Sequence, residues 1–269
     1  MQPPSSPLSA ARSWLFVPGN RPERFDKAAG SDADLVIIDL EDAVPAAQRQ
    51  AARQSARDWL GAGGRAVVRT NAGDDEFSRD LQAIAGATGL LGAVLAKASD
   101  AAEVGRRASA LGVPVIPLIE SAAGLAAAEP IAAVAGVARL ALGTIDLALD
   151  LGCRDEWAAM LRARCRRVLA SRLAGLPGPI DGVCVSIEDQ QQVASATRRA
   201  SAVGFTAKLC IHPAQVAAVH KALRPDEAEI ERARAIVASC EAGQDVGRVN
   251  GEMIDAPVIA AARALLARV

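Results

Sequence analysis

Eight short apolar runs alternate with helix-like segments along the 269-residue chain. Strands that alternate with helices in this way form βα units and a parallel sheet. Eight such units close into a barrel, and barrels of this kind have about 250 residues in one domain. The sequence therefore predicts an α/β fold, a (β/α)8 TIM barrel. The expected strands are Leu15–Pro18, Leu35–Leu40, Ala66–Thr70, Ala93–Lys97, Pro114–Ile119, Ala138–Leu142, Ile180–Val185 and Thr206–Ile211.

The chain continues beyond the eighth unit. Two further helices are expected at Asp226–Ala242 and Ala256–Val269, joined by a loop rich in Gly, Asn and Asp. At the other end, the first residues are rich in Pro and Ser. We predict a flexible tail over residues 1–12, a catalytic barrel over 13–222 and a C-terminal helical extension over 223–269. An extension that the barrel does not need is suited to packing on a neighbouring subunit, so a homo-oligomer is expected.

Composition excludes several classes of protein. The net charge is −1, so nothing indicates a nucleic-acid partner. No run approaches the roughly 20 apolar residues of a membrane-spanning helix, and the N-terminus lacks the features of a signal peptide. The five cysteines form no C-x-x-C pair. We interpret them as reduced, mostly buried thiols and expect a cytoplasmic protein.

Charged residues stand where several of the expected strands end. Asp39, Glu41 and Asp42 follow one strand, and Arg69 closes the next. The C-terminal ends of barrel strands share one mouth, where active sites are built. Three acids within four residues are costly to crowd together without a cation, although a helix first turn can also be rich in acids. We favour a functional role for these acids, and Arg69 is suited to holding a carboxylate or an oxyanion.

Two more carboxylates end neighbouring strands, Glu120 and Asp146. A pair of carboxylates at one mouth suits Mg²⁺, which takes few protein oxygens and keeps several waters. The alternative for Asp146 is a helix N-cap. Lys97 closes the fourth expected strand, either as a Schiff-base lysine or in a structural ion pair with the acids. Arg21 follows a Gly-Asn turn and is suited to binding a carboxylate or phosphate, unless this is an ordinary βα turn.

Two other features have a structural and a functional reading. His212 is suited to acid–base chemistry, but we favour a structural histidine that bonds to the backbone. A basic run lies on one predicted helix, where it forms a solvated face or contacts a phosphorylated ligand. Its members are Arg162, Arg164, Arg166, Arg167 and Arg172.

The chain resembles the citrate lyase β-subunit group of the HpcH/HpaI aldolase superfamily. The resemblance covers the chain from about Trp14 to the end. It is carried by LFVPGNRPERFDKA, VIIDLEDAVP, VVRTN, VIPLIESAAGL, LALGTIDLALDLG, DGVCVSIED, GFTAKLCIHPAQ and GEMIDAPVIAAARALL. So many ordered blocks make this assignment much stronger than any single motif. The family fold is a (β/α)8 barrel, in agreement with the strand count.

The resemblance implies roles for individual residues. Glu120 and Asp146 correspond to the Mg²⁺ ligands, and Arg69 to the substrate-binding arginine. Glu41 and Asp42 correspond to acids that hold metal-bound water. Arg21 and Lys97 stay candidates for substrate binding, and a metal-dependent family makes a Schiff base at Lys97 unlikely.

The resemblance also implies a shared active site and a reaction. Asp255 corresponds to an acid–base residue that reaches the site of an adjacent subunit, and a trimer is favoured. The implied activity is Mg²⁺-dependent cleavage of a 3-hydroxyacyl thioester of citramalyl-CoA, malyl-CoA or citryl type, giving acetyl-CoA or an acetyl carrier and an oxo acid. A thioesterase, a condensing enzyme, or a citrate lyase subunit that depends on an acyl carrier protein are the alternatives. One departure is Ile145, where many relatives carry Glu, and it bears on the choice of substrate.

Overall fold

A computed structural model describes residues 6–241, 247–249 and 252–267. The chain forms two compact units, Met1–His220 and Lys221–Val269. They are described separately below.

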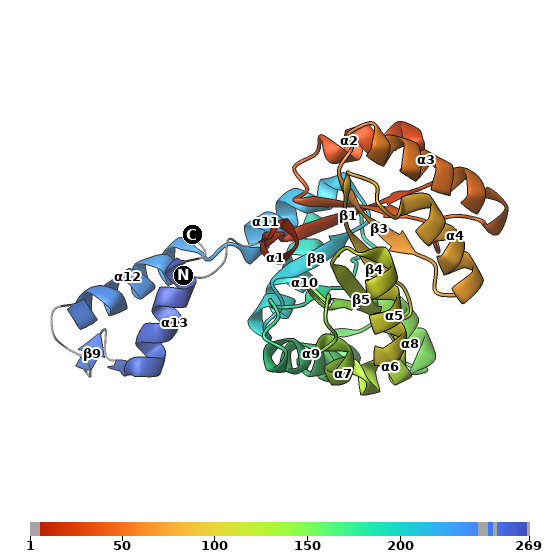
Figure 1. Cartoon of the computed structure of the whole chain (residues 1–269). Helices are drawn as coiled ribbons and strands as arrows, with labels where there is room; N and C mark the ends of the chain where they lie inside the picture. Colours follow the sequence, from red (N-terminus) through yellow and green to blue (C-terminus); the bar gives the residue numbers. More distant parts are fainter. Residues whose placement is uncertain (1–5, 242–246, 250–251, 268–269) are drawn as a thin grey trace. The chain divides into compact units, whose positions relative to one another are not determined.

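The first unit is a closed barrel of eight parallel strands in sequence order, β1 to β8 (Figure 1). Each strand pairs with its neighbours in the chain, and β8 closes the barrel by pairing with β1. The predicted barrel is thus confirmed. The strands are β1 Ser13–Pro18, β2 Leu35–Asp39, β3 Ala66–Thr70, β4 Leu90–Leu95, β5 Val115–Ile119, β6 Ala141–Leu142, β7 Ile180–Asp181 and β8 Ala207–Cys210.

Helices cover the outside of the barrel (Figure 1). They alternate with the strands as the sequence predicts, although the segment after β5 is divided into two short helices and a short helix directly follows β6. The helices of this unit are α1 Pro7–Ala10, η1 Pro22–Arg24, α2 Phe25–Ala29, η2 Ala46–Gln48, α3 Arg49–Gly61, α4 Asp74–Ile84, α5 Ala101–Leu111, α6 Ala122–Ala126, α7 Ala128–Ala132, α8 Thr144–Asp150, α9 Trp157–Leu173, α10 Gln190–Ala202, η3 Pro213–Gln215 and α11 Val216–Leu223, the last of which runs into the second unit.

The barrel interior is filled by apolar side chains. Successive residues of a strand face opposite sides, so every second residue points inward. The buried cluster contains Trp14, Leu35 with Ile37, Val67 and Val94, together with Ile116, Leu118, Ala141, Ile180, Ala207 and Leu209. This alternation determines which residues reach the mouth, because it continues to the ends of the strands.

The structure describes residues 6–12 of the segment predicted as a flexible tail, and residues 1–5 lie outside the described residues. Residues 7–10 form α1, with Ser6 as its N-cap. Leu8 and Ala11 are buried in the cluster that fills the barrel. The buried guanidinium of Arg139 donates to the carbonyl of Ala11 at 2.7 Å. Leu8 and Ala11 stand among Pro and Ser residues in the sequence, and their burial holds this segment to the barrel.

The second unit contains α12 Glu227–Glu241 and α13 Ala256–Leu266, which pack together through Ala233, Ile236, Ile259 and Ala262. Between them lie β9 Gly247–Val249 and β10 Glu252–Ile254, an antiparallel pair where the sequence predicted only a loop. No helix in the described residues has the length and apolar content needed to cross a membrane.

Candidate active site

A cavity of about 440 Å³ opens at the C-terminal ends of the strands. Three charged residues continue the inward-facing positions of their strands. Each follows an inward-facing apolar residue by two positions: Asp39 follows Ile37, Arg69 follows Val67, and Glu120 follows Leu118. Three strand ends thereby bring charged side chains to one mouth, as predicted. The lining residues are Phe16, Asp39, Asp42, Ala43, Arg69, Leu118, Glu120, Leu142, Gly143, Thr144, Ile145, Asp146, Val183, Leu209 and Ile211.

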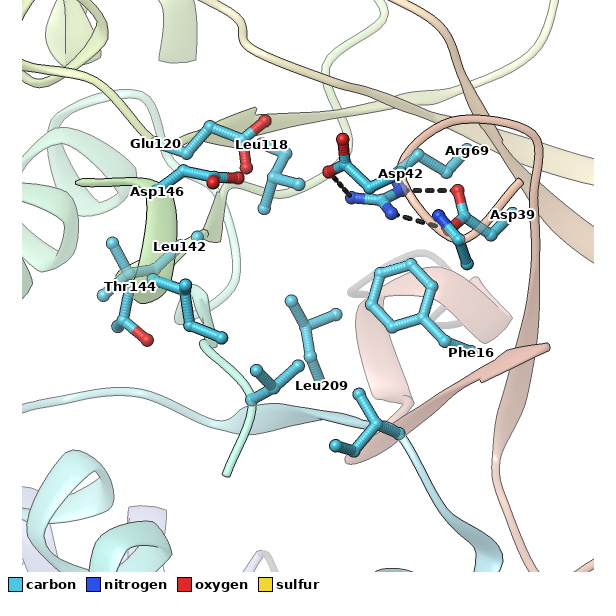
Figure 2. Close-up of a pocket in the computed structure, with 15 residues that line it drawn as sticks. Phe16, Asp39, Asp42, Arg69, Leu118, Glu120, Leu142, Thr144, Asp146 and Leu209 are labelled. Carbon is cyan, nitrogen blue, oxygen red and sulfur yellow. Dashed lines mark hydrogen bonds and ion pairs between the residues drawn. The ribbon is translucent and has the colours of Figure 1, made fainter. Parts of the chain in front are cut away.

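Arg69 is held firmly at the wall of this cavity. Its Nε and Nη2 donate to the two carboxylate oxygens of Asp39 at 2.7 and 2.6 Å (Figure 2). Its guanidinium carbon also lies 5.0 Å from the ring centre of Phe16. Burial favours the neutral form, but the hydrogen bonds and charge of Asp39 prevail and raise the pKa of Arg69. Arg69 is therefore a fixed cation.

One edge of the Arg69 guanidinium, formed by Nε and Nη2, is filled by Asp39. The remaining nitrogen, Nη1, lies 3.3 Å from an oxygen of Glu41 and 3.3 Å from one of Asp42. A ligand anion would meet Arg69 at the edge formed by Nη1 and the second N–H of Nη2.

Glu41 and Asp42 form a second pair of contacts with Lys97. The Lys97 Nζ lies 3.1 Å from Glu41 and 3.6 Å from Asp42. The ion pair that the sequence left as one alternative for Lys97 is thus present. Burial raises the pKa of Glu41 to about 7, against the opposing charge of Arg69. This carboxyl group gains or loses a proton near neutral pH.

Glu120 is the most strongly perturbed acid at the mouth. Burial raises its pKa to about 8, and the charges of Glu41 and Asp146 act in the same direction. One of its oxygens accepts from the backbone N–H of Lys97 at 2.7 Å. Lys97 has a φ of 52°, and it is the one non-glycine residue with positive φ in the described part of the chain. This unusual backbone conformation presents the N–H to Glu120.

Asp146 lies in the first turn of α8 and also lines the cavity. Figure 2 shows its carboxylate beside that of Glu120, and the charge of Asp146 contributes to the raised pKa of Glu120. The N-cap position of α8 is Gly143, so the helix-cap alternative for Asp146 is not realised. Gly143 has a further role, because a Cβ there would stand 2.5 Å from a Glu120 oxygen. No motif or spacing in the amino-acid sequence singles out this glycine.

The mouth holds more negative than positive charge. Within the described part of the chain, five acids at the mouth lie beside two cations, Arg69 and Lys97; the acids are Asp39, Glu41, Asp42, Glu120 and Asp146. A divalent cation would balance this excess, and a hard oxygen pair such as Glu120 with Asp146 fits Mg²⁺. In the described residues no three His, Cys, Asp or Glu side chains form a complete metal-binding group. A bound ion would therefore take its other ligands from water or substrate.

Besides Glu41 and Lys97, three further predicted residues are outside this cavity lining. Arg21 is exposed and pairs with Glu23 at 2.6 Å. Asp255 belongs to the second unit, where it is the N-cap of α13 and accepts from the backbone N–H of Val258. His212 caps η3 and accepts from the backbone N–H of Ala214, which confirms the structural reading.

Comparison with known proteins identifies the family. The profile of the HpcH/HpaI aldolase/citrate lyase family matches residues 12–213. A citrate lyase subunit beta-like protein of Mycobacterium tuberculosis is 38% identical over 267 residues, covering 97% of this chain and 96% of the relative. A (3S)-malyl-CoA thioesterase of Cereibacter sphaeroides is 34% identical over 271 residues, covering 96% of this chain and 94% of the relative. The chain belongs to the HpcH/HpaI aldolase/citrate lyase family.

A solved structure shows the same fold with ligands. CitE from Mycobacterium tuberculosis, in complex with magnesium, acetoacetate and coenzyme A, is 36% identical with a TM-score of 0.88, covering 97% of this chain and 98% of that one. The family and the fold predicted from the sequence are thus both confirmed.

Proposed function

We propose that this protein is a Mg²⁺-dependent carbon–carbon lyase that acts on a 3-hydroxyacyl thioester of citramalyl-CoA, malyl-CoA or citryl type. The products are acetyl-CoA, or an acetyl carrier, and an oxo acid. The observation that carries the proposal is the Glu120–Asp146 carboxylate pair beside the fixed cation Arg69 in one cavity. The Mg²⁺ and coenzyme A complex of the M. tuberculosis relative supports it.

Glu120 and Asp146 would hold the metal. When bound, the ion supplies a Lewis acid that polarises the oxygens of the oxo-acid half. Gly143 leaves the space that Glu120 needs, and the Lys97 N–H orients its carboxylate. The other two acids, Glu41 and Asp42, would hold water at this site and keep Arg69 and Lys97 in place.

Arg69 would stabilise the charge that develops on the acetyl half. In the cleavage step the substrate hydroxyl would pass its proton to Asp255 of a neighbouring subunit, the bond between the two halves would break, and the electron pair would move to the thioester as an enolate. A preorganised cation that faces such charge lowers the barrier. Because Asp39 takes up the Nε–H and one N–H of Nη2, the edge formed by Nη1 and the second Nη2 N–H would face the enolate.

The remaining roles belong to residues outside the cavity lining. Asp255 of a neighbouring subunit would donate the proton that converts the enolate into the acetyl thioester. Arg21 and Lys97, both about half exposed, would contact the anionic parts of the thioester.

The assembly is proposed to be a homo-oligomer, with a trimer favoured. We also place the protein in the cytoplasm, and the free thiols of Cys153, Cys165, Cys184 and Cys210 agree with a reducing compartment.

Product analysis tests the proposal. Purified protein with Mg²⁺ is incubated with citramalyl-CoA, malyl-CoA and related thioesters, and the products are separated. We expect acetyl-CoA and an oxo acid in equal amounts, and no turnover in Glu120→Gln or Asp146→Asn. Metal binding is measured directly by calorimetry in the same variants. Full activity in excess EDTA would contradict the metal assignment.

The thioesterase of C. sphaeroides makes hydrolysis the second candidate. A thioesterase would release free CoA and an intact hydroxy acid from the same substrates. A condensing enzyme would consume acetyl-CoA and an oxo acid. A citrate lyase subunit would act only on an acyl carrier protein, so turnover of CoA thioesters by the isolated chain distinguishes it from the others.

A further inference from the structure

A second, smaller cavity of about 150 Å³ lies outside the barrel wall. Lys208 of β8 points outward, because Ala207 and Leu209 on either side of it face the barrel interior. Helices α9 and α10 complete the walls. The lining residues are Asp155, Trp157, Arg164, Val183, Cys184, Val185, Gln192, Ala196, Arg199 and Lys208.

Positive charge exceeds negative charge around this side cavity. Lys208 and Arg164 share one buried carboxylate, Asp181, at 2.7 and 2.9 Å. Arg199 adds a third cation from the exposed side of α10. The one acid in the lining, Asp155, already accepts a hydrogen bond from Thr144 at 2.8 Å. Two buried cations on one carboxylate favour an additional anion.

Arg164 has an unused donor. Its side chain is 9% exposed, and Nε is taken up by Asp181. Its Nη1 is buried and has no hydrogen-bond partner. A buried N–H without an acceptor is unfavourable, and that of a guanidinium especially so. The prediction of a solvated basic face on this helix is therefore wrong for Arg164, and also for Arg167, which is fully buried.

Trp157 holds the two guanidinium groups in position. The guanidinium carbons of Arg164 and Arg199 lie 4.8 and 5.2 Å from the centre of its ring. Contact with an aromatic ring limits the freedom of a guanidinium and leaves its N–H edges available to an oxyanion. An arginine pair of this kind is preorganised for binding.

We propose that the side cavity binds a small oxyanion, a carboxylate or a phosphate group, through Arg164 and Arg199. Its volume suits one such group and little more. Val183 lines both this cavity and the mouth, and Thr144, which also lines the mouth, is bonded to Asp155. The proposal is independent of the reaction carried out at the mouth.

Titration with inorganic phosphate and with acetate tests the proposal. Both are added to the full chain in EDTA, and binding is followed by calorimetry and by tryptophan fluorescence. We expect a single anion to bind per chain and to change the tryptophan fluorescence. This fluorescence change should be lost in Trp157→Phe. Arg199→Gln should weaken binding about tenfold, the effect of losing one charge-assisted hydrogen bond. Arg198→Gln is the matched control, because Arg198 is exposed on the same helix and does not line the cavity.

The outcomes are distinguishable. Binding of phosphate alone or of acetate alone supports the site and identifies its ligand. Equal weakening in the Arg199 and Arg198 variants would show only general charge attraction and overturn the proposal, as would the absence of binding of either anion. Arg164→Lys retains a cation for Asp181 and so protects the fold. It should nevertheless lose binding, because an ammonium cannot replace the free guanidinium edge.

Discussion

At the residue scale, the central feature of the mouth is the fixed position of Arg69. An arginine side chain without a partner could change its rotamer, but here two nitrogens of the guanidinium are bonded to Asp39. Such a bidentate pair adds geometric specificity to charge. The third nitrogen, Nη1, is bordered by Glu41 and Asp42. The arginine is thus positioned by the protein before any ligand arrives.

Arg69→Lys is expected to lower kcat/KM about 100-fold, because an ammonium cannot bond both oxygens of Asp39 and also reach the substrate. Steady-state kinetics with the active thioester measure the loss. Arg53→Lys is the control, since Arg53 is also buried and bonds Asp80 at 2.7 Å, but lies outside the cavity lining. The role of Arg69 would be wrong if both variants retained wild-type kcat/KM.

Glu41 is expected to make stability depend on pH. Its folded pKa is about 7, above the ordinary value of 4.5, so the unfolded chain releases this proton first. In metal-free protein the contribution of Glu41 to the free energy of unfolding should therefore fall as pH rises from about 4.5 to 7 and be constant above it. Glu41→Gln should remove this pH-dependent decrease in the free energy of unfolding, which is on the order of 3 kcal/mol.

Urea unfolding in EDTA at pH 5, 6 and 7.5 measures this dependence. Glu231→Gln on the exposed side of α12 is the control and should leave the slope as it is. An identical slope in wild type and Glu41→Gln would contradict the raised pKa.

At the scale of elements, the alternation of strand residues explains what the sequence could predict. Every second residue of a strand faces the barrel interior, so the positions of Arg69 and Glu120 after apolar runs were enough to assign them to the mouth. Side-chain contacts between different strands and helices could not be predicted from the sequence. The partner of Arg69 among three nearby acids depends on side-chain rotamers, and the need for Gly143 depends on how closely β5 and β6 approach.

Gly143→Ala is expected to damage the site more than the fold. The new Cβ would stand 2.5 Å from a Glu120 oxygen and 2.7 Å from the Glu120 Cβ, so the carboxylate would have to move. We expect at least about a tenfold loss of kcat and weaker Mg²⁺ binding, in line with a misplaced ligand. Gly61→Ala is the control, because nothing lies within 4 Å of that Cβ position. Equal Mg²⁺ affinity in the two variants would show that metal binding does not depend on the close approach of residue 143 to Glu120.

At the scale of the whole molecule, the chain consists of a barrel unit and a smaller C-terminal unit. The barrel was predictable because eight apolar runs alternate with helix-like segments. The short helix α8 was not, since Thr144–Asp150 directly follows a two-residue strand and has no side-chain cap. The helices of the C-terminal unit were predictable, whereas β9 and β10 are a pair of three-residue strands that follow no clear pattern. The role of Asp255 depends on assembly, which one chain does not contain.

Variants of Asp255 can test whether the C-terminal unit completes the active site of a neighbouring subunit. Because Asp255 also caps α13, replacement by Ala would remove a helix cap along with the carboxylate. Asp255→Asn keeps an N-cap acceptor and removes only the charge, so it should fold normally and lose turnover. Mixing it with Glu120→Gln should restore partial activity, because some mouths then receive Glu120 from one subunit and Asp255 from another. Verified mixed oligomers without recovery would show that Asp255 acts within its own chain or only as a cap, and a fully active monomer would exclude a shared site.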